Sequence, residues 1–219
     1  MYAKFESIND AIKVFHEIEN KVIITWNALI SGFTQNKMFQ EALKTFSSTI
    51  LESKPNEYTF GSVLSAIASS ESISLRYGQW CHSYLFKLGL DKNPIVSGAL
   101  LDMYAKRGSI NESCKVFDEI TNKNQVAWTA IISAHSRHGD YESVMKLYDD
   151  ITNQSFEPDS ITFFIGINCV WKKRNGRKGE RSVRVNGQTI QNRANPGALF
   201  VYGRYVRAGR AVKRGGRVF

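Results

Sequence analysis

A long internal repeat constrains this 219-residue chain more than any other feature of its sequence. The first ten residues, MYAKFESIND, return almost unchanged as MYAKRGSINE at 103–112. VFHEI at 14–18 returns as VFDEI at 116–120, and ITWNALIS at 24–31 returns as VAWTAIIS at 126–133. Because all three pairs share an offset of 102 residues, the chain is predicted to consist of repeated units, and Met1 takes the place that Met103 takes inside a unit.

Shorter units lie between the copies of this long repeat. Residues 23–56 predict two helices, TWNALISGFTQ and KMFQEALKTFSSTIL, with apolar residues at helical spacing, a turn at Asn36–Lys37 and a stop at Pro55. The same scheme recurs in three further units, 57–93, 94–124 and 125–159. A partial short unit precedes them at 1–22, and another unit starts at 160.

A helix pair of this size cannot bury its apolar residues alone, but stacking on its neighbours buries them. We therefore predict an all-α solenoid with a concave surface lined by the first helix of each unit. The large aromatic residues at repeated positions are predicted to be core residues. They are Trp26, Phe33, Phe46, Tyr104 and Trp128.

The positive charge of the chain lies outside the repeats. The net charge is +9, but residues 164–219 hold 14 Lys and Arg and a single acidic residue, Glu180. These residues carry +13, so residues 1–163 carry −4. The overall charge is therefore no argument for nucleic-acid binding by the repeats.

The sequence predicts neither an enzyme nor a metal or cofactor site. The four His residues lie in different predicted helices or turns, and there is no C-x-x-C, His-x-Glu, phosphate loop or nucleophile motif. The three cysteines, Cys81, Cys114 and Cys169, are far apart and fit a reducing compartment. No apolar run is long enough to span a membrane, so we expect no membrane partner and no small-molecule substrate.

Three strings carry a resemblance to a known family. They are TWNALISGFTQN with EALKTF and KPNEYTF, LLDMYAKRGSINESCKVFDEI, and AWTAIISAHSRHGDYESVMKLYDDI. Together, over residues 1 to about 163, they resemble pentatricopeptide repeats of the plant type that cycles long, short and standard motifs. The resemblance implies a right-handed α-solenoid in which 57–93 is a long-type unit and 94–124 a short-type unit.

The resemblance also implies that each unit faces one base of single-stranded RNA. The base-reading residues would be an early residue of the first helix and the last residue of the unit. In 23–56 these are Asn27 and Asn56, a pair that implies a pyrimidine; in 125–159 they are Thr129 and Asp159, a pair that implies guanine.

Two other units offer only one reading side chain each. Asn93 is paired with Gly61 and Asn124 with Gly98, and both units are expected to discriminate poorly because glycine has no side chain. In the partial unit the last residue is Val22, which cannot read a base. An alternative role is open for Asn56 and Asp159: each follows a proline and precedes a helix, as a helix N-cap does.

By this resemblance the intact parent protein would bind organellar RNA selectively. It would act in a mitochondrion or chloroplast, in cytidine-to-uridine editing or other RNA processing, together with editing or processing proteins. Two alternatives stay open: a scaffold for protein interactions, and a gene fragment without function.

The last 56 residues break the pattern. After Phe163 we expect the start of a further unit to give way to a disordered, basic tail. One interpretation is an RNA-binding arm. The other is a frameshift near Phe164, because codons that encode this tail can also encode repeat-like sequence one base later. We accordingly expect the chain to be a fragment of a longer array, so that any targeting peptide would lie upstream.

Overall fold

The computed structural model describes residues 8–154, 158–175, 181–185 and 188–192. The described residues form helices from Ile8 to Asn175, followed by two short strands. The helices are α1 (Ile8–Glu17), α2 (Ile23–Gln35), α3 (Phe39–Glu52), α4 (Glu57–Ser69), α5 (Leu75–Leu88), α6 (Pro94–Lys106), α7 (Ile110–Glu119), α8 (Gln125–His138), α9 (Tyr141–Asn153) and α10 (Ser160–Asn175). The strands are β1 (Arg181–Val185) and β2 (Gln188–Asn192).

Local sequence signals set the ends of these helices. Gly89 ends α5 with φ of 68°, a left-handed conformation that glycine adopts without strain. Pro94 is the first residue of α6, where its missing N–H costs no helical hydrogen bond. The turn predicted at Asn36–Lys37 separates α2 from α3, with Lys37 at φ of 59°.

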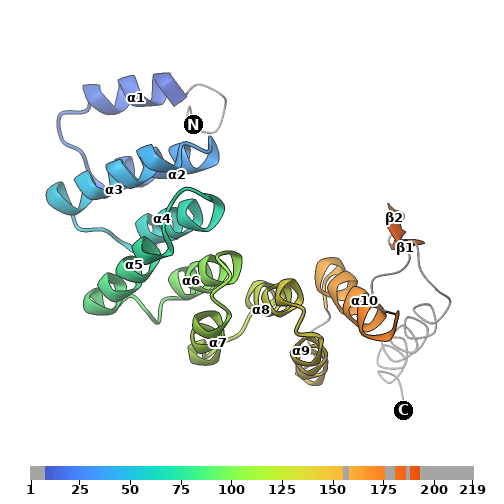
Figure 1. Cartoon of the computed structure of the whole chain (residues 1–219). Helices are drawn as coiled ribbons and strands as arrows, with labels where there is room; N and C mark the ends of the chain where they lie inside the picture. Colours follow the sequence, from blue (N-terminus) through green and yellow to red (C-terminus); the bar gives the residue numbers. More distant parts are fainter. Residues whose placement is uncertain (1–7, 155–157, 176–180, 186–187, 193–219) are drawn as a thin grey trace, which may run out of the picture. The chain divides into compact units, whose positions relative to one another are not determined.

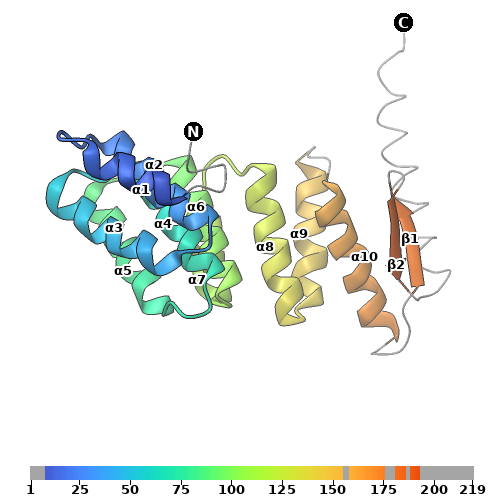
Figure 2. The same ribbon diagram turned by 90° about the horizontal axis from the view of Figure 1, so that it is seen from above.

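The chain divides into two compact units, residues 1–134 and 135–219. In the first, the first helices α2, α4 and α6 pack side by side (Figure 1, Figure 2). The second helices α3, α5 and α7 pack against them. All five aromatic residues predicted to be buried are buried: Trp26, Phe33, Phe46, Tyr104 and Trp128.

The 102-residue repeat of the sequence is also a repeat of side-chain contacts. Phe15 meets Trp26 edge to face at a ring-centroid distance of 4.8 Å and an angle of 74°. One repeat later Phe117 meets Trp128 at 4.9 Å and 73°. A lysine ammonium also lies over each phenylalanine ring, Lys21 at 5.3 Å in the first copy and its counterpart 102 residues on at 5.0 Å in the second. Each junction from a short unit to the next therefore uses the same contacts.

In the second compact unit, α10 packs on α9. Gly166 makes this approach possible, because a Cβ there would lie 3.1 Å from the ring of Tyr148. The helix continues to Asn175, past Phe163, where the sequence pattern was expected to stop. The apolar run ITFFIGINCV at 161–170 supplies the helix with the hydrophobic residues that the charged sequence after it lacks.

The structure also differs from the expected irregular tail at the two strands. β1 and β2 form an antiparallel hairpin in which Val183 pairs with Ile190 and Arg181 with Asn192. Alternating, β-branched residues in RSVRV and QTIQN explain why these segments adopt strands. The rest of the predicted tail lies outside the described residues. Within the described residues no helix is both long and apolar enough to cross a membrane.

Arg107, which follows α6, ties two neighbouring units together. Its guanidinium donates to the carbonyl oxygens of Ser70 and Ile73, in the loop between α4 and α5. We expect Arg107→Ala to lower the free energy of unfolding by about 2 kcal/mol, because two carbonyls lose a charged donor. Urea unfolding followed by circular dichroism measures this effect.

Lys106→Ala is the matched control for the Arg107 variant. Lys106 is its sequence neighbour, is more exposed, and forms an ion pair within its own helix with Asp102 at 2.8 Å. Its removal should cost less than about 0.5 kcal/mol. Equal losses from the two variants would contradict the inter-unit role of Arg107.

Candidate nucleic-acid interface

The second residue of each first helix is a large apolar side chain that is exposed to solvent. In α4 this residue is Tyr58, whose surface is 57% exposed. The equivalent residues of α2, α6, α8 and α10 are Ile24, Ile95, Val126 and Ile161, and they are between 44% and 73% exposed. Since burial of such side chains is favourable, their exposure at one equivalent position suggests that a ligand covers them.

The exposure of these five residues was not predicted from the sequence. Apolar residues at helical spacing are expected in the core, whereas these five lie one residue after each helix begins. The signal was present as a constant offset: each follows the last residue of the preceding unit by two positions.

The last residue of each complete unit caps the first helix of the next. Asn56 accepts a hydrogen bond from the backbone N–H of Thr59 at 3.1 Å, and Asp159 accepts one from that of Thr162 at 2.7 Å. The alternative role as helix N-caps is therefore confirmed for both. Asn93 and Asn124 are caps as well. Asn93 accepts from the Ile95 N–H at 2.9 Å, and Asn124 accepts from the Ala127 N–H at 2.9 Å. Val22 occupies the equivalent position before α2 and makes no side-chain cap.

The structure brings Asn27 and Asn56 into direct contact. Asn27 is the fifth residue of α2, and its Nδ2 donates to Asn56 Oδ1 at 2.9 Å. Thr59 Oγ1 lies 2.5 Å from Asn27 Oδ1 and donates to it. Two residues 29 positions apart thus share one half-buried polar site, which the unit boundary alone did not reveal.

The other fifth residues of first helices differ in what they offer. Thr129 lies in α8, and its hydroxyl donates to the Gln125 carbonyl at 2.9 Å. Thr129 lies in the first compact unit and Asp159 in the second. A Cβ added to Gly61 would lie 3.4 Å from Ile95 Cγ2, whereas a Cβ added to Gly98 would meet nothing within 4 Å. Gly98 therefore has room for a larger side chain.

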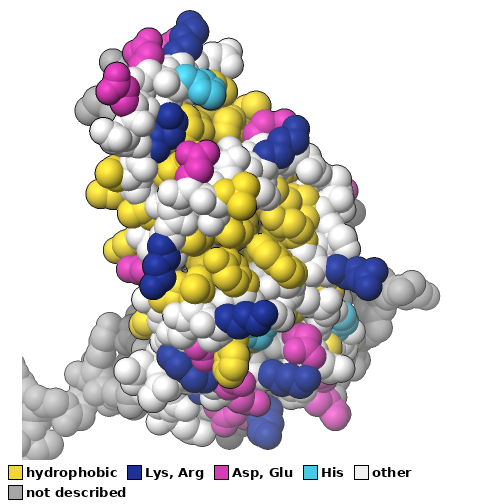
Figure 3. Space-filling model, turned by 90° about the vertical axis from the view of Figure 1, so that its left-hand side faces the viewer, with side chains coloured by type: hydrophobic (Ala, Val, Ile, Leu, Met, Phe, Trp, Pro, Cys, Tyr) yellow, Lys and Arg dark blue, Asp and Glu magenta, His cyan; other side chains and the backbone are white. Residues whose placement is uncertain are grey.

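The starts of α2 and α4 lie on one side of the first compact unit. In Figure 1 the loops that lead from α1 to α2 and from α3 to α4 lie on the left. Figure 3 views the molecule from that side and shows apolar side chains gathered in the middle of the face. An apolar surface bordered by polar and charged groups suits a base, which has an apolar face and a polar edge.

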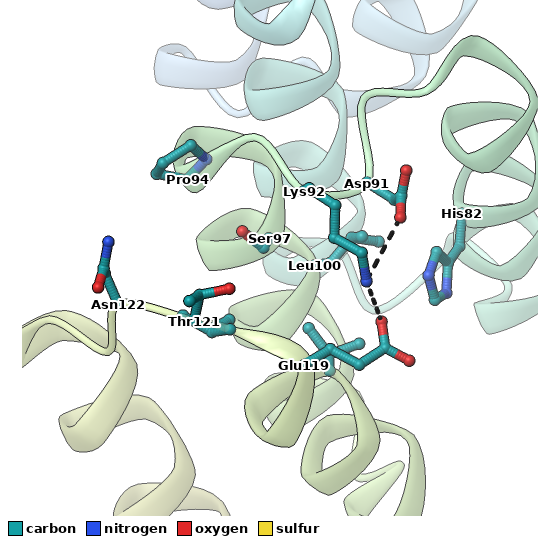
Figure 4. Close-up of a pocket in the computed structure, with 11 residues that line it drawn as sticks. His82, Asp91, Lys92, Pro94, Ser97, Leu100, Glu119, Thr121 and Asn122 are labelled. Carbon is teal, nitrogen blue, oxygen red and sulfur yellow. Dashed lines mark hydrogen bonds and ion pairs between the residues drawn. The ribbon is translucent and has the colours of Figure 1, made fainter.

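A pocket of about 220 Å³ lies between the loops before α6 and α8 (Figure 4). Lys92 lies within it and forms ion pairs with Asp91 at 3.6 Å and Glu119 at 3.3 Å. The hydrogen bond that the Lys92 ammonium donates to Glu119 raises the pKa of Lys92. Two carboxylates next to this ammonium make the pocket a poor site for phosphate. Its lining residues are His82, Asp91, Lys92, Pro94, Ser97, Leu100, Val116, Glu119, Ile120, Thr121 and Asn122.

Other polar groups of the first compact unit are structural. His82 Nδ1 lies 3.0 Å from the hydroxyl of Tyr104, whose pKa burial raises to about 12. Burial also raises the pKa of the Cys81 thiol to about 12, so it is not a thiolate nucleophile at neutral pH. Across the described part of the chain, no three His, Cys, Asp or Glu side chains converge as metal ligands would.

The repeats match a known family. The pattern of the PPR repeat matches residues 24–49 and 96–124, and that of the PPR repeat family matches 123–172. A mitochondrial pentatricopeptide repeat-containing protein of Arabidopsis thaliana is 60% identical over 123 residues, 56% of this chain and 16% of its own length. Another from the same plant is 33% identical over 170 residues, 77% of this chain and 30% of its own length.

The fold agrees with these sequence matches. PPR10 from maize, solved in complex with an 18-nucleotide psaJ RNA element, superposes with a TM-score of 0.64 at 17% identity, over 78% of this chain and 26% of PPR10. The predicted all-α helical-repeat fold is thereby confirmed. This chain is a pentatricopeptide repeat protein, and it spans less than a third of the length of the curated relatives described above.

The two kinds of cap should differ in their contribution to stability. Asn93→Ala removes one cap and should lower the free energy of unfolding by about 1 kcal/mol. Asn56→Ala should cost about 2 kcal/mol or more, because it also leaves Asn27 Nδ2 without its acceptor. Urea unfolding of both variants tests this, and a smaller loss for Asn56→Ala would contradict the shared polar site.

Proposed function

We propose that this chain binds single-stranded RNA, one base to each helix-pair unit. The observation that carries the proposal is the recurrence of three features where a first helix begins. In each unit from 23 to 159 these features are an exposed apolar residue at the second position of the first helix, a fifth residue that is polar or glycine, and a polar last residue that caps the next first helix. A base could stack on the first and place its polar edge at the other two.

In this proposal Asn27 with Asn56 selects a pyrimidine, and Thr129 with Asp159 selects guanine. Asn93 and Asn124 contribute one polar side chain each, and their units discriminate poorly. Support comes from the family match and from PPR10, whose structure was solved with an RNA element. Residues 1–163 carry −4, so contacts to bases rather than to phosphates would provide most of the affinity.

For the longer parent protein we propose a role in organellar RNA processing. Relatives named mitochondrial and chloroplastic support a location in one of these organelles. The unit lengths support membership of the plant subfamily that cycles long, short and standard motifs. With that membership we propose a role in cytidine-to-uridine editing, together with processing proteins. A frameshift near Phe164 stays part of the proposal, and sequencing the transcript across that codon tests it.

Fluorescence anisotropy with labelled oligonucleotides tests RNA binding by the 219-residue chain. The probe is an oligoadenylate with a cytidine and a guanosine three positions apart, made in both orders so that either strand polarity is covered. We expect one order to bind more tightly than plain oligoadenylate and than the matching DNA. Equal binding to all of these at low salt would contradict the proposal and favour a protein scaffold.

Tyr58 provides a test that leaves the core intact. Because the ring is exposed, Tyr58→Ala should fold normally yet weaken RNA binding about tenfold, the loss expected for one base–aromatic stack. The matched control is Phe86→Ala, since Phe86 is 72% exposed but lies on a second helix, α5. A loss that is equal in the two variants would show that stacking at Tyr58 is not specific.

Gly98 provides a test by gain of function. Since a side chain at Gly98 meets no neighbour, Gly98→Asn should fold and pair a new amide with Asn124. We expect the unit 94–124 to change from indifferent to selective for a pyrimidine by roughly fivefold, the value of about one hydrogen bond. Anisotropy with four RNAs that differ at the facing nucleotide measures it, and unchanged ratios would contradict the assigned reading position.

A further inference from the structure

We propose that Thr59 is a positioning residue that sets the orientation of both amides in the base-reading pair Asn27 and Asn56. This inference rests on the proposed function and adds a third residue to it. Thr59 is fully buried in α4, and its side chain is directed at the two amides and not at solvent.

The orientation of the Asn56 amide follows from the backbone. The N–H of Thr59 can only donate, so the atom 3.1 Å from it must be the Asn56 oxygen, Oδ1. In return Thr59 Oγ1 accepts from the Asn56 N–H at 3.1 Å. This reciprocal pair of bonds is a capping box, and it leaves Asn56 Nδ2 directed away from the helix.

The orientation of the Asn27 amide follows from that of Asn56. The group 2.9 Å from Asn56 Oδ1 must donate, so it is the Asn27 nitrogen, Nδ2. Asn27 Oδ1 then faces Thr59 Oγ1 at 2.5 Å. Because this hydroxyl already accepts a bond from a backbone N–H, its own proton is available for Asn27 Oδ1. The hydroxyl of Thr59 therefore distinguishes the two ends of the Asn27 amide.

The amide pair therefore offers RNA a defined set of groups. Asn56 Oδ1 accepts from two donors, the Thr59 N–H and Asn27 Nδ2, and these occupy its two lone pairs. Two groups can still bond a base. Asn56 Nδ2 has two N–H groups, and Asn27 has one N–H on Nδ2 and one lone pair on Oδ1. Such a surface suits a pyrimidine, whose O2 accepts from an N–H and whose N3 either accepts, in cytosine, or donates to the Asn27 lone pair, in uracil. It suits guanine poorly, because the guanine N1–H and N2 amino group would face N–H groups.

The other asparagine caps of the first compact unit lack this arrangement. The residues equivalent to Thr59 are Val96 after Asn93 and Ala127 after Asn124, neither of which has a hydroxyl. Their fifth-position partners are Gly61 and Gly98. Asn93 and Asn124 thus cap their helices without such a hydroxyl. The hydroxyl of Thr59 is therefore not needed for capping, which leaves the orientation of the base-reading amides as its role.

Thr59→Val tests the inference, because valine keeps the shape of threonine and removes the hydroxyl. We expect its RNA affinities to lose their dependence on the base that faces the unit 23–56, so that the ratio of the best to the worst of four RNAs falls roughly threefold to tenfold. Thr59→Ser restores the hydroxyl and should restore the ratio. The probes are the oligoadenylates with a fixed guanosine and with C, U, A or G at the facing position.

Thr49→Val is the matched control. Thr49 is also fully buried, and its hydroxyl donates to the Thr45 carbonyl within α3. It should leave the base ratio unchanged. A second readout, the hydrogen-exchange rate of the Asn27 side-chain amide by NMR, should rise in Thr59→Val and not in Thr49→Val, whether or not RNA is present.

The outcomes separate this inference from the proposed function. If wild-type protein prefers no base and no RNA, the proposed function fails. If wild-type protein is selective and Thr59→Val keeps the same ratio, or loses affinity equally for all four RNAs, Thr59 is only a helix cap and the inference is overturned.

Discussion

The structure depends on the fact that no helix pair in this chain can bury its own apolar residues. Each first helix places residues such as Ile30, Phe60 and Leu101 against the neighbouring pairs, where they are fully buried. Stability of such an array is the sum of many local interfaces. The direction of stacking also brings α2, α4 and α6 into one layer, so that the starts of these three helices are equivalent by construction.

This constraint explains how a stabilising group can also serve as a reader. The last residue of each complete unit is held by the backbone of the next helix, and its side chain is therefore fixed before any ligand arrives. Preorganisation of this kind reduces the ordering cost of binding. In the pair Asn27 and Asn56 the fixing is most complete, because the two amides and a buried hydroxyl satisfy one another.

Much of the fold was predictable from the sequence, because it follows from periodicity and from helix-ending residues. The turn at Asn36–Lys37 lies where the sequence places it, between α2 and α3. The helical extension to Asn175 was not predicted, since an apolar run without family pattern gave no helical signal. At the candidate site, sequence identified residues by their place in the unit, but the bond between Asn27 and Asn56 depends on stacking across a unit boundary. Tyr58 and its equivalents were missed because an apolar residue is normally assigned to the core.

The matching contacts of Phe15 with Trp26 and of Phe117 with Trp128 bear on how such a chain can change in length. A block of 102 residues begins at the contact of Phe15 with Trp26 and ends at the matching contact of Phe117 with Trp128. If such a block were gained or lost, each remaining helix would still pack against a helix of the same kind. Unequal exchange between copies of the gene segment would then lengthen or shorten the array by three helix pairs without creating an ill-fitting neighbour. A change by one or two pairs would instead join surfaces that have not been matched to each other.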